Sequence, residues 1–135
     1  MIDCRWYPPG VAVADALDAG ELEARCRVAT ATAAAGDGLL WVDIAEPDRA
    51  TIERVAQLLH LDPTLVRAVG QRHPRNRILP WGDVRHAVLP AGRLLDGHLV
   101  VRVIEVVFLP GCVLTMRWGD ADHGAEPYPL EEVVH

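Results

Sequence analysis

The fold is decided at residues 39–47, LLWVDIAEP, where a compact apolar run, interrupted only by Asp43, ends in Glu46 and Pro47. A compact apolar run between a glycine turn at residues 36–38 and a proline predicts a buried strand that leads directly into a helix. Pro47 is expected at the first helical position and Asp48 in the first turn, where its charge favours the helix. Apolar residues then recur at helical spacing as far as His60, which predicts an amphipathic helix.

Elements on either side of this junction follow from the same signals. Asp62 has the chemistry of an N-cap and Pro63 suits a first helical position, so a second short helix is predicted up to Gly70. Upstream, residues 2–7 read as a strand that ends at a Pro-Pro-Gly turn. Residues 14–35 are rich in helix formers and predict a helix, either continuous or broken at Gly20.

The second half of the sequence predicts a run of strands joined by tight turns. The expected strands are residues 78–81, 84–89, 98–109 and 112–118, with turns at the Gly-Asp, Asp-Gly and Pro-Gly pairs between them. In the long run 98–109 only Arg102 and Glu105 interrupt the apolar residues, which is typical of a central strand covered on both faces. The fold class predicted is α/β (α+β), a mixed parallel and antiparallel sheet flanked by helices.

Length and charge restrict the function. The 135 residues fit one domain, expected at residues 1–119, and residues 120–135 have the composition of a linker and the start of a truncated following segment. A formal net charge of −6 argues against nucleic-acid binding, which needs a basic face. The N-terminus lacks the pattern of an export signal, and the longest apolar stretch falls short of the ~18 residues that span a bilayer. A soluble chain in a reducing compartment is expected.

No catalytic residue, metal site or cofactor is predicted from these patterns. The chain has no serine, and its histidines lack the spacing of a zinc site. Cys26 and Cys112 are candidate nucleophiles, but each lies in an apolar pattern that favours a small buried hydrophobe. Asp43, Glu46 and Asp48 have the oxygen ligands that magnesium takes, although a helix start is the preferred interpretation. The protein is therefore not expected to be an enzyme.

One basic segment remains as a candidate contact surface. Arg72, His73, Arg75 and Arg77 fall in a polar, proline-broken stretch that predicts an exposed loop. Such a loop can contact an anionic headgroup or nucleic acid, and it can equally be a solvated loop without a partner. A stand-alone α/β interaction module that binds a protein or anionic ligand through the Arg72 to Arg77 loop is thus one hypothesis, and an enzyme that uses Cys112 is another.

The order of motifs resembles the N-terminal cytoplasmic domain of CorA-type magnesium/cobalt transporters. The similarity lies in Leu40–Pro47, then an amphipathic helix, then Leu61–Val66, and downstream in Ile104–Arg117, with Trp81-Gly82-Asp83 matching a Tyr-Gly-Asp turn of the family. It covers residues 39–118. Each motif alone is short, and the set in this order carries the resemblance.

The resemblance implies a cytoplasmic regulatory domain of a divalent-cation transporter. Its partners would be other copies of itself in a pentamer and the transmembrane domain of the same protein, at the cytoplasmic side of the plasma membrane. The transmembrane helices and the Gly-Met-Asn pore signature of the family are absent from these 135 residues. Magnesium is the ion that the family's regulatory sites bind.

The chain departs from the family where that regulatory site would be. An acidic pair on the short second helix is replaced by Arg67 and Ala68, and a guanidinium cannot hold a cation. We therefore expect that the isolated domain lacks the family's magnesium site and that Arg67 pairs with an acidic group on a neighbouring subunit or segment. Arg67, Arg72, Arg75 and Arg77 are the candidate interface or anion contacts.

Overall fold

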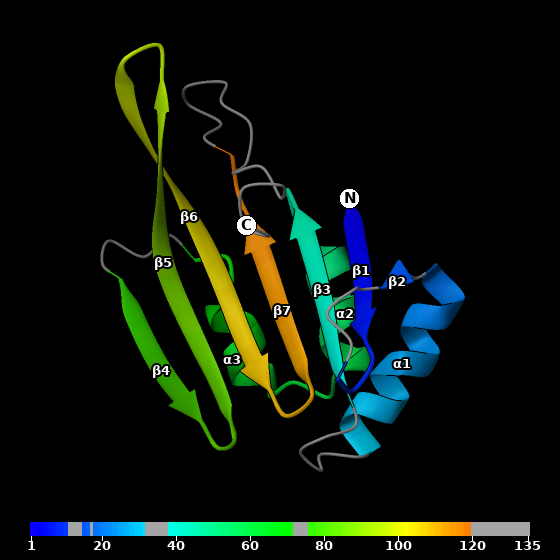
Figure 1. The fold of residues 1–135 in the computed structure, drawn as a ribbon. Coiled ribbons are helices and arrows are strands. Elements are labelled where there is room, and N and C mark those ends of the chain that lie inside the picture. The colour runs from blue at the N-terminus through cyan, green and yellow to red at the C-terminus, as the bar shows by residue number, and fades with distance from the viewer. Residues whose placement is uncertain (11–14, 17, 32–37, 72–75, 120–135) are drawn as a thin grey trace.

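A computed structural model describes residues 1–10, 15–16, 18–31, 38–71 and 76–119. In this part of the chain seven strands form one mixed sheet in the order β2-β1-β3-β7-β6-β5-β4 (Figure 1). The strands are β1 (Ile2–Tyr7), β2 (Asp15–Ala16), β3 (Leu39–Ala45), β4 (Arg77–Trp81), β5 (Val84–Leu95), β6 (His98–Leu109) and β7 (Cys112–Arg117). The helices are α1 (Ala19–Ala31), α2 (Arg49–Leu58) and α3 (Pro63–Ala68). This confirms the predicted fold class.

The centre of the sheet is a parallel pair made by strands far apart in the sequence. β3 pairs with β7 from Leu40 opposite Cys112 to Ala45 opposite Arg117, and every other pairing among the described strands is antiparallel. The chain returns from β3 to β7 through α2, α3 and the strands β4, β5 and β6. The LLWVDIA run is therefore buried in the middle of the sheet, next to the last strand.

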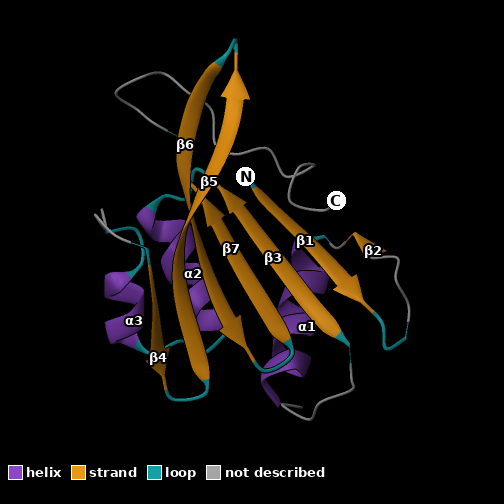
Figure 2. Cartoon of the chain, turned by 60° about the vertical axis from the view of Figure 1, so that its left-hand side comes forward, coloured by secondary structure: helices purple, strands orange, loops and turns teal. Residues whose placement is uncertain are grey.

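All three helices pack on one face of the sheet, as Figure 2 shows from a second direction. Alternate residues of β1, β3 and β7 point to this face and form one core with the helices. Its fully buried members include Leu40, Val42, Ile44, Leu65 and Met116. Burial of this apolar surface is the main contribution to the stability of the fold.

The opposite face has no described helix on it, so the prediction that β6 is covered on both sides was wrong. Phe108 lies on that face and is 44% exposed, and Leu89 and Ile78 are also exposed. The sequence could not reveal this, because an apolar residue looks the same in the sequence whether its side chain is buried or exposed. The apolar run of β6 therefore predicted a strand covered on both faces.

The first helix begins later than the sequence predicts. Residues 15–16 form the short strand β2, and α1 starts at Ala19. Asp18 accepts hydrogen bonds from the backbone N–H groups of Gly20 and Glu21, while its own N–H donates to the Glu21 carboxylate. This reciprocal capping box places Gly20 inside the first turn, where the free backbone N–H groups are capped. Of the two alternatives, the helix is therefore continuous through Gly20.

The boundaries of three further elements differ from those predicted from the sequence. Asp48 is the N-cap of α2 rather than a residue of its first turn, so Pro47 precedes the helix. β4 begins at Arg77, which belongs to a strand and not to the predicted loop. β5 continues to Leu95 instead of ending at Leu89. The predicted linker and truncated segment at residues 120–135 lie outside the described residues, and so do Arg72, His73 and Arg75.

The turns agree with the sequence. Gly111 has φ +71° in the β6–β7 turn, and Asp96 and Gly97 both have positive φ, which is the requirement of the two-residue hairpin turn between β5 and β6. At Gly38 the reason for glycine is steric as well, since a Cβ there would lie 2.5 Å from the Trp6 ring. Within the described residues, no helix is long and apolar enough to cross a membrane.

Candidate functional site

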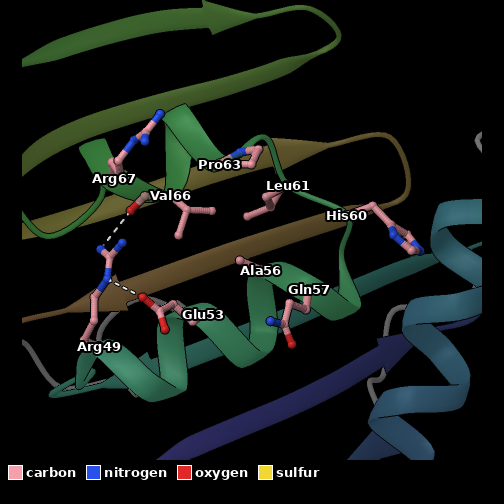
Figure 3. Close-up of a pocket in the computed structure, with 9 residues that line it drawn as sticks. All are labelled: Arg49, Glu53, Ala56, Gln57, His60, Leu61, Pro63, Val66 and Arg67. Atoms are coloured by element: carbon pink, nitrogen blue, oxygen red, sulfur yellow. Dashed lines mark hydrogen bonds and ion pairs between the residues drawn. The ribbon is translucent and has the colours of Figure 1, made fainter.

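The candidate site is a groove between α2 and α3, the two helices that carry the sequence resemblance (Figure 3). Each helix has an aspartate cap: Asp48 accepts from the N–H of Thr51, and Asp62 accepts from the N–H of Thr64, both at 2.7 Å. These backbone hydrogen bonds lower the pKa of both aspartates below the usual value of 3.8. The caps fix where each helix begins and hence the walls of the groove.

The groove has a volume of about 620 Å³ and carries more basic than acidic groups. Its lining comprises Arg49, Glu53, Ala56, Gln57, His60, Leu61, Pro63, Val66 and Arg67. Glu53 is the one carboxylate in this lining. A groove with this composition does not offer the several oxygen ligands that a magnesium or calcium ion requires.

Arg49 ties the two helices together across the groove. Its Nε donates to Glu53 Oε1 at 2.9 Å, and its Nη1 donates to the backbone carbonyl of Val66 at 3.0 Å, as the dashed lines in Figure 3 mark. The carbonyl lies in the last turn of α3, where helix carbonyls lack intrahelical partners. The Glu53 carboxylate and two nitrogens of the Arg49 guanidinium are therefore engaged in hydrogen bonds within the groove.

Arg67 lies at the groove but points away from Arg49 in Figure 3. Its side chain is exposed, and its Nη2 contacts the Thr64 hydroxyl at 3.5 Å, the upper limit of a hydrogen bond. Its charge adds to the lowering of the Asp62 pKa. In the described part of the molecule no acidic group forms an ion pair with Arg67, so its expected acidic partner on a neighbouring subunit or segment stays a prediction.

The structure does not bring the predicted basic residues together into one described patch. Arg67 is on α3, while Arg77 starts β4 opposite Val88, on the face of the sheet that the helices cover. The three acidic residues considered as magnesium ligands each make a different contact within the protein. Asp43 binds Arg117, Glu46 accepts the Gly119 N–H, and Asp48 caps α2. No three His, Cys, Asp or Glu side chains among the described residues are placed to hold a metal ion.

A buried acid–histidine pair next to α3 was missed by the sequence analysis. Glu105 Oε2 and His86 Nε2 are 2.7 Å apart, and both side chains are almost completely buried. Glu105 Oε1 also accepts the backbone N–H of Gly70, directly after α3, at 3.0 Å. The carboxylate thus attaches the end of α3 to β5 and β6. The only sequence signal was an acid that interrupts a strongly apolar strand.

Gly70 also lies close to Trp118, the first residue after the end of β7. It has φ +77°, and a Cβ placed there would be 3.5 Å from the ring of Trp118 and 3.8 Å from Ile52 of α2. Trp118 directly follows β7 and packs against the core. The N–H of Gly119 in turn donates to the Glu46 carboxylate at 2.6 Å, on the loop before α2. The residue directly after α3 and the loop before α2 therefore both lie next to Trp118 and Gly119, which follow β7.

The uncovered face holds a second buried polar network, centred on Asp43. Its carboxylate accepts from Nε and Nη2 of Arg117, at 3.0 and 2.6 Å, and from the Thr115 hydroxyl. Thr115 also accepts from Trp41 Nε1 at 3.0 Å. This network joins the two parallel strands β3 and β7 side chain to side chain. Its compensated charges identify it as a structural connection between the strands.

The cysteines are unsuited to nucleophilic chemistry. All three are buried, and none forms a disulfide. Burial raises the pKa of the Cys26 thiol to about 11 and that of the Cys4 thiol to about 12, and it raises the pKa of Cys112 further. A buried thiol with a raised pKa is neither ionised nor accessible at neutral pH. This confirms the interpretation of the cysteines as small buried hydrophobes.

The comparisons with known proteins identify the fold. No protein-family model and no curated protein sequence matches the chain. Among solved structures, the complete CorA magnesium transporter from Methanocaldococcus jannaschii is similar with a TM-score of 0.58 and 12% sequence identity, over 89% of this chain and 32% of that one. The soluble domain of CorA from the same organism is similar with a TM-score of 0.56 and 13% identity, over 89% of this chain and 41% of that one.

The chain thus spans about a third to two fifths of the length of these proteins. TM-scores of 0.56–0.58 show a shared fold, while identities of 12–13% leave the activity open. Together with the ordered motifs around β3, α2, α3 and the β6–β7 hairpin, the comparison shows that this chain has the fold of the CorA soluble domain.

Proposed function

We propose that this chain is the cytoplasmic regulatory domain of a CorA-like divalent-cation transporter. The observation that carries the proposal is the fold: nearly nine tenths of the chain is covered by the structural match to a magnesium transporter and to its soluble domain. The partners would be further copies of the chain in an oligomer and a transmembrane domain of the same protein. The transported ions would be magnesium and cobalt.

The contacts around Gly70 and Trp118 support a regulatory role. A movement of α2 or α3 would change how closely Gly70, directly after α3, approaches Trp118, and it would change the contact of Glu46, on the loop before α2, with Gly119. These contacts connect the groove to the segment that follows β7. A ligand or subunit that binds at the groove can thereby shift the equilibrium between two arrangements of that segment, provided that it binds one of them more tightly.

The proposal is tested by measuring cation uptake by the full product of the gene in cells that lack their own magnesium transporter. Wild-type protein should take up magnesium or cobalt, and uptake should fall as the internal cation concentration rises. Gly70→Leu, which inserts a side chain between α3 and Trp118, should weaken that dependence. Gly82→Leu is the matched control, since Gly82 also has positive φ but has no neighbour within 4 Å.

Two results would contradict the proposal separately. Absence of uptake above the empty vector would exclude a transporter. Uptake whose dependence on internal cation is the same for wild type and Gly70→Leu would exclude regulation through this contact, while leaving the transporter itself intact.

The regulatory ligand is a separate question, because Arg67 occupies the position of an acidic residue of the family. We infer that the chain does not bind magnesium at the groove. Isothermal titration of the purified chain with magnesium should give no submillimolar binding, and Arg67→Ala should behave like the wild type. Submillimolar binding that a change near Arg67 abolishes would overturn this inference.

A further inference from the structure

Glu46 has a backbone conformation that its own side chain and the next residue both disfavour. Its φ is +49°, in the left-handed region that residues other than glycine rarely adopt. Pro47 follows it, and the ring of a proline pushes the residue before it towards extended backbone. Strain of this kind persists only where the surrounding structure holds it, and it is concentrated in binding sites and switch regions. Contacts with other parts of the chain must therefore stabilise this conformation.

Two other non-glycine residues of the described chain have positive φ, and both lie where this is common. His60, with φ +52°, directly follows the C-cap of α2, where helices often end in a left-handed residue. Asp96, with φ +49°, belongs to the two-residue turn of the β5–β6 hairpin. Glu46 lies instead between the end of β3 and the N-cap of α2. Neither helix capping nor a hairpin turn explains its conformation.

Glu46 is held by hydrogen bonds to the residues on both sides of Trp118. Its backbone N–H donates to the carbonyl of Arg117 at 2.9 Å, and its carboxylate accepts the N–H of Gly119 at 2.6 Å. Arg117 is itself fixed by its buried ion pair with Asp43. One residue of the β3–α2 connection therefore holds the chain at the point where it leaves β7.

The connection between β3 and α2 leaves Glu46 as the main point of rotation. β3 ends at Ala45 and the N-cap of α2 is Asp48, so only Glu46 and Pro47 lie between them. The proline ring fixes φ of Pro47 near about −65°. A displacement of α2 relative to the sheet must therefore be absorbed mainly by the backbone dihedral angles of Glu46. Such a rotation also moves the carboxylate that holds Gly119.

We propose that Glu46 is a strained hinge that latches the segment after β7 to the start of α2. In the closed state, which the structure shows, Glu46 is left-handed and its carboxylate binds the Gly119 N–H. In the open state, Glu46 relaxes to the extended backbone that is preferred before proline, and Gly119 is released. Because strain raises the free energy of the closed state, the two states lie closer in free energy. A ligand that binds one of them more tightly can then shift their populations.

Arg49 connects this hinge to the groove. It is the first residue of α2, three positions after Glu46, and it donates to the Val66 carbonyl of α3 across the groove (Figure 3). A ligand or subunit that displaces Arg49 from Val66 would free the start of α2 to move, and Glu46 would absorb that movement. The inference names the residue through which the groove acts on the segment after β7, and in this respect it rests on the proposed function.

Amide hydrogen exchange of the purified chain, followed residue by residue by NMR, tests the latch. Glu46→Ala removes the carboxylate and should speed exchange of the Gly119 N–H roughly fivefold or more, the effect of losing one hydrogen bond. Glu46→Gln keeps an acceptor oxygen and should exchange at close to the wild-type rate. The matched control is Glu21→Ala, which removes a carboxylate that accepts the N–H of Asp18 and should leave Gly119 unchanged.

Thermal unfolding of the same variants tests the strain. Glu46→Gly and Glu46→Ala remove the same carboxylate, but glycine adopts positive φ without a steric penalty and alanine does not. Glu46→Gly should therefore melt a few degrees higher than Glu46→Ala. Glu53, in the middle of α2, is the matched control position. There the order should reverse, because glycine destabilises the interior of a helix.

Arg49→Ala tests the connection between the hinge and the groove. Loss of the contact with Val66 should speed exchange at Gly119, although by less than Glu46→Ala does. Arg54→Ala is the matched control, because Arg54 lies on the same helix and is also exposed, and it should have no effect. These measurements need only this chain, so they give the same answer whether or not it belongs to a transporter.

Three results would overturn the inference. Equal exchange at Gly119 in wild type and Glu46→Ala would show that the carboxylate does not hold the segment. A melting temperature of Glu46→Gly at or below that of Glu46→Ala would show that the backbone is not strained. Equal exchange in Arg49→Ala and Arg54→Ala would show that the hinge does not respond to the groove. Each result leaves the proposed transporter standing, because that function is judged by cation uptake.

Discussion

The two halves of the β5–β6 hairpin have similar sequences and opposite environments. In the inner half, His86, Glu105 and Val107 are buried on the face that the helices cover, between β4 and β7. In the outer half, residues 89–95 and 98–103, which we call the arm, Leu94 and Leu99 are 71% and 67% exposed. Both halves are dominated by valine and leucine. The difference lies in their neighbours, because burial on a sheet depends on which strands flank it and which helices cover it.

The comparison also shows where polar groups are tolerated. The inner half contains a buried carboxylate whose two oxygens are both satisfied, one by His86 and one by Gly70. A buried polar group is stable only when its hydrogen bonds are made. Exposed groups in the outer half do not need a partner within the protein, since they can bond to water. Substitutions should therefore have large effects in the inner half and small effects in the arm.

The largest effect is expected at Glu105. Glu105→Ala leaves buried groups of His86 and Gly70 without their shared carboxylate and should lower the free energy of unfolding by about 3–5 kcal/mol. Replacing both members, as Glu105→Met with His86→Leu, should cost less than the sum of the two single changes. Urea denaturation measures each variant, with Glu53→Ala on the exposed side of α2 as the control. A loss below about 1 kcal/mol for Glu105→Ala would show that the contact contributes little.

The same substitution placed in both halves of β6 tests the comparison directly. Val107→Ala opens a cavity in the core and should lower the free energy of unfolding by about 2–3 kcal/mol. Val101→Ala removes exposed surface and should change it by less than about 0.5 kcal/mol. Both are measured by urea denaturation. Equal losses would mean that the arm is packed as tightly as the core.

A smaller, pH-dependent effect is expected from the cap of α3, the helix over the inner half. The folded-state pKa of Asp62 is lowered, so its ionised form contributes stability above the unfolded value of 3.8, and this contribution is lost as the pH falls through the folded pKa. Asp62→Asn keeps a capping oxygen without the charge and should show a weaker decrease of the melting temperature below about pH 4. Identical pH profiles for wild type and Asp62→Asn would contradict this.

The smallest effect is expected at Gly92 in the arm. An added Cβ would lie 3.3 Å from the end of the exposed Leu99 side chain, which can move aside. Gly92→Ala should leave the global stability within about 0.5 kcal/mol and slow amide hydrogen exchange in residues 98–103, because alanine is less flexible in a strand. Faster exchange in the arm would indicate that the contact with Leu99 is disrupted instead.

The sequence by itself determined the elements and the order in which they occur. The apolar run of β3, the capped helix α3 and the β6–β7 turn were each predicted because their signals are local: an apolar run, an N-cap followed by proline, and a Pro-Gly pair. The start of α1 was placed wrongly because Asp18 and Glu21 form a capping box within a segment that is helix-favouring throughout. The resemblance to CorA depended on the same local motifs.

Only the tertiary structure decided which parts of these elements are buried and which residues meet. Hydrophobicity alone could not show that β6 is covered along its inner half and uncovered in the arm, since coverage depends on strands and helices distant in the sequence. The buried contacts of Glu105 with His86 and Gly70, and of Asp43 with Arg117, join residues 19 to 74 positions apart. Such contacts arise from the register of the sheet, which no short stretch of sequence specifies.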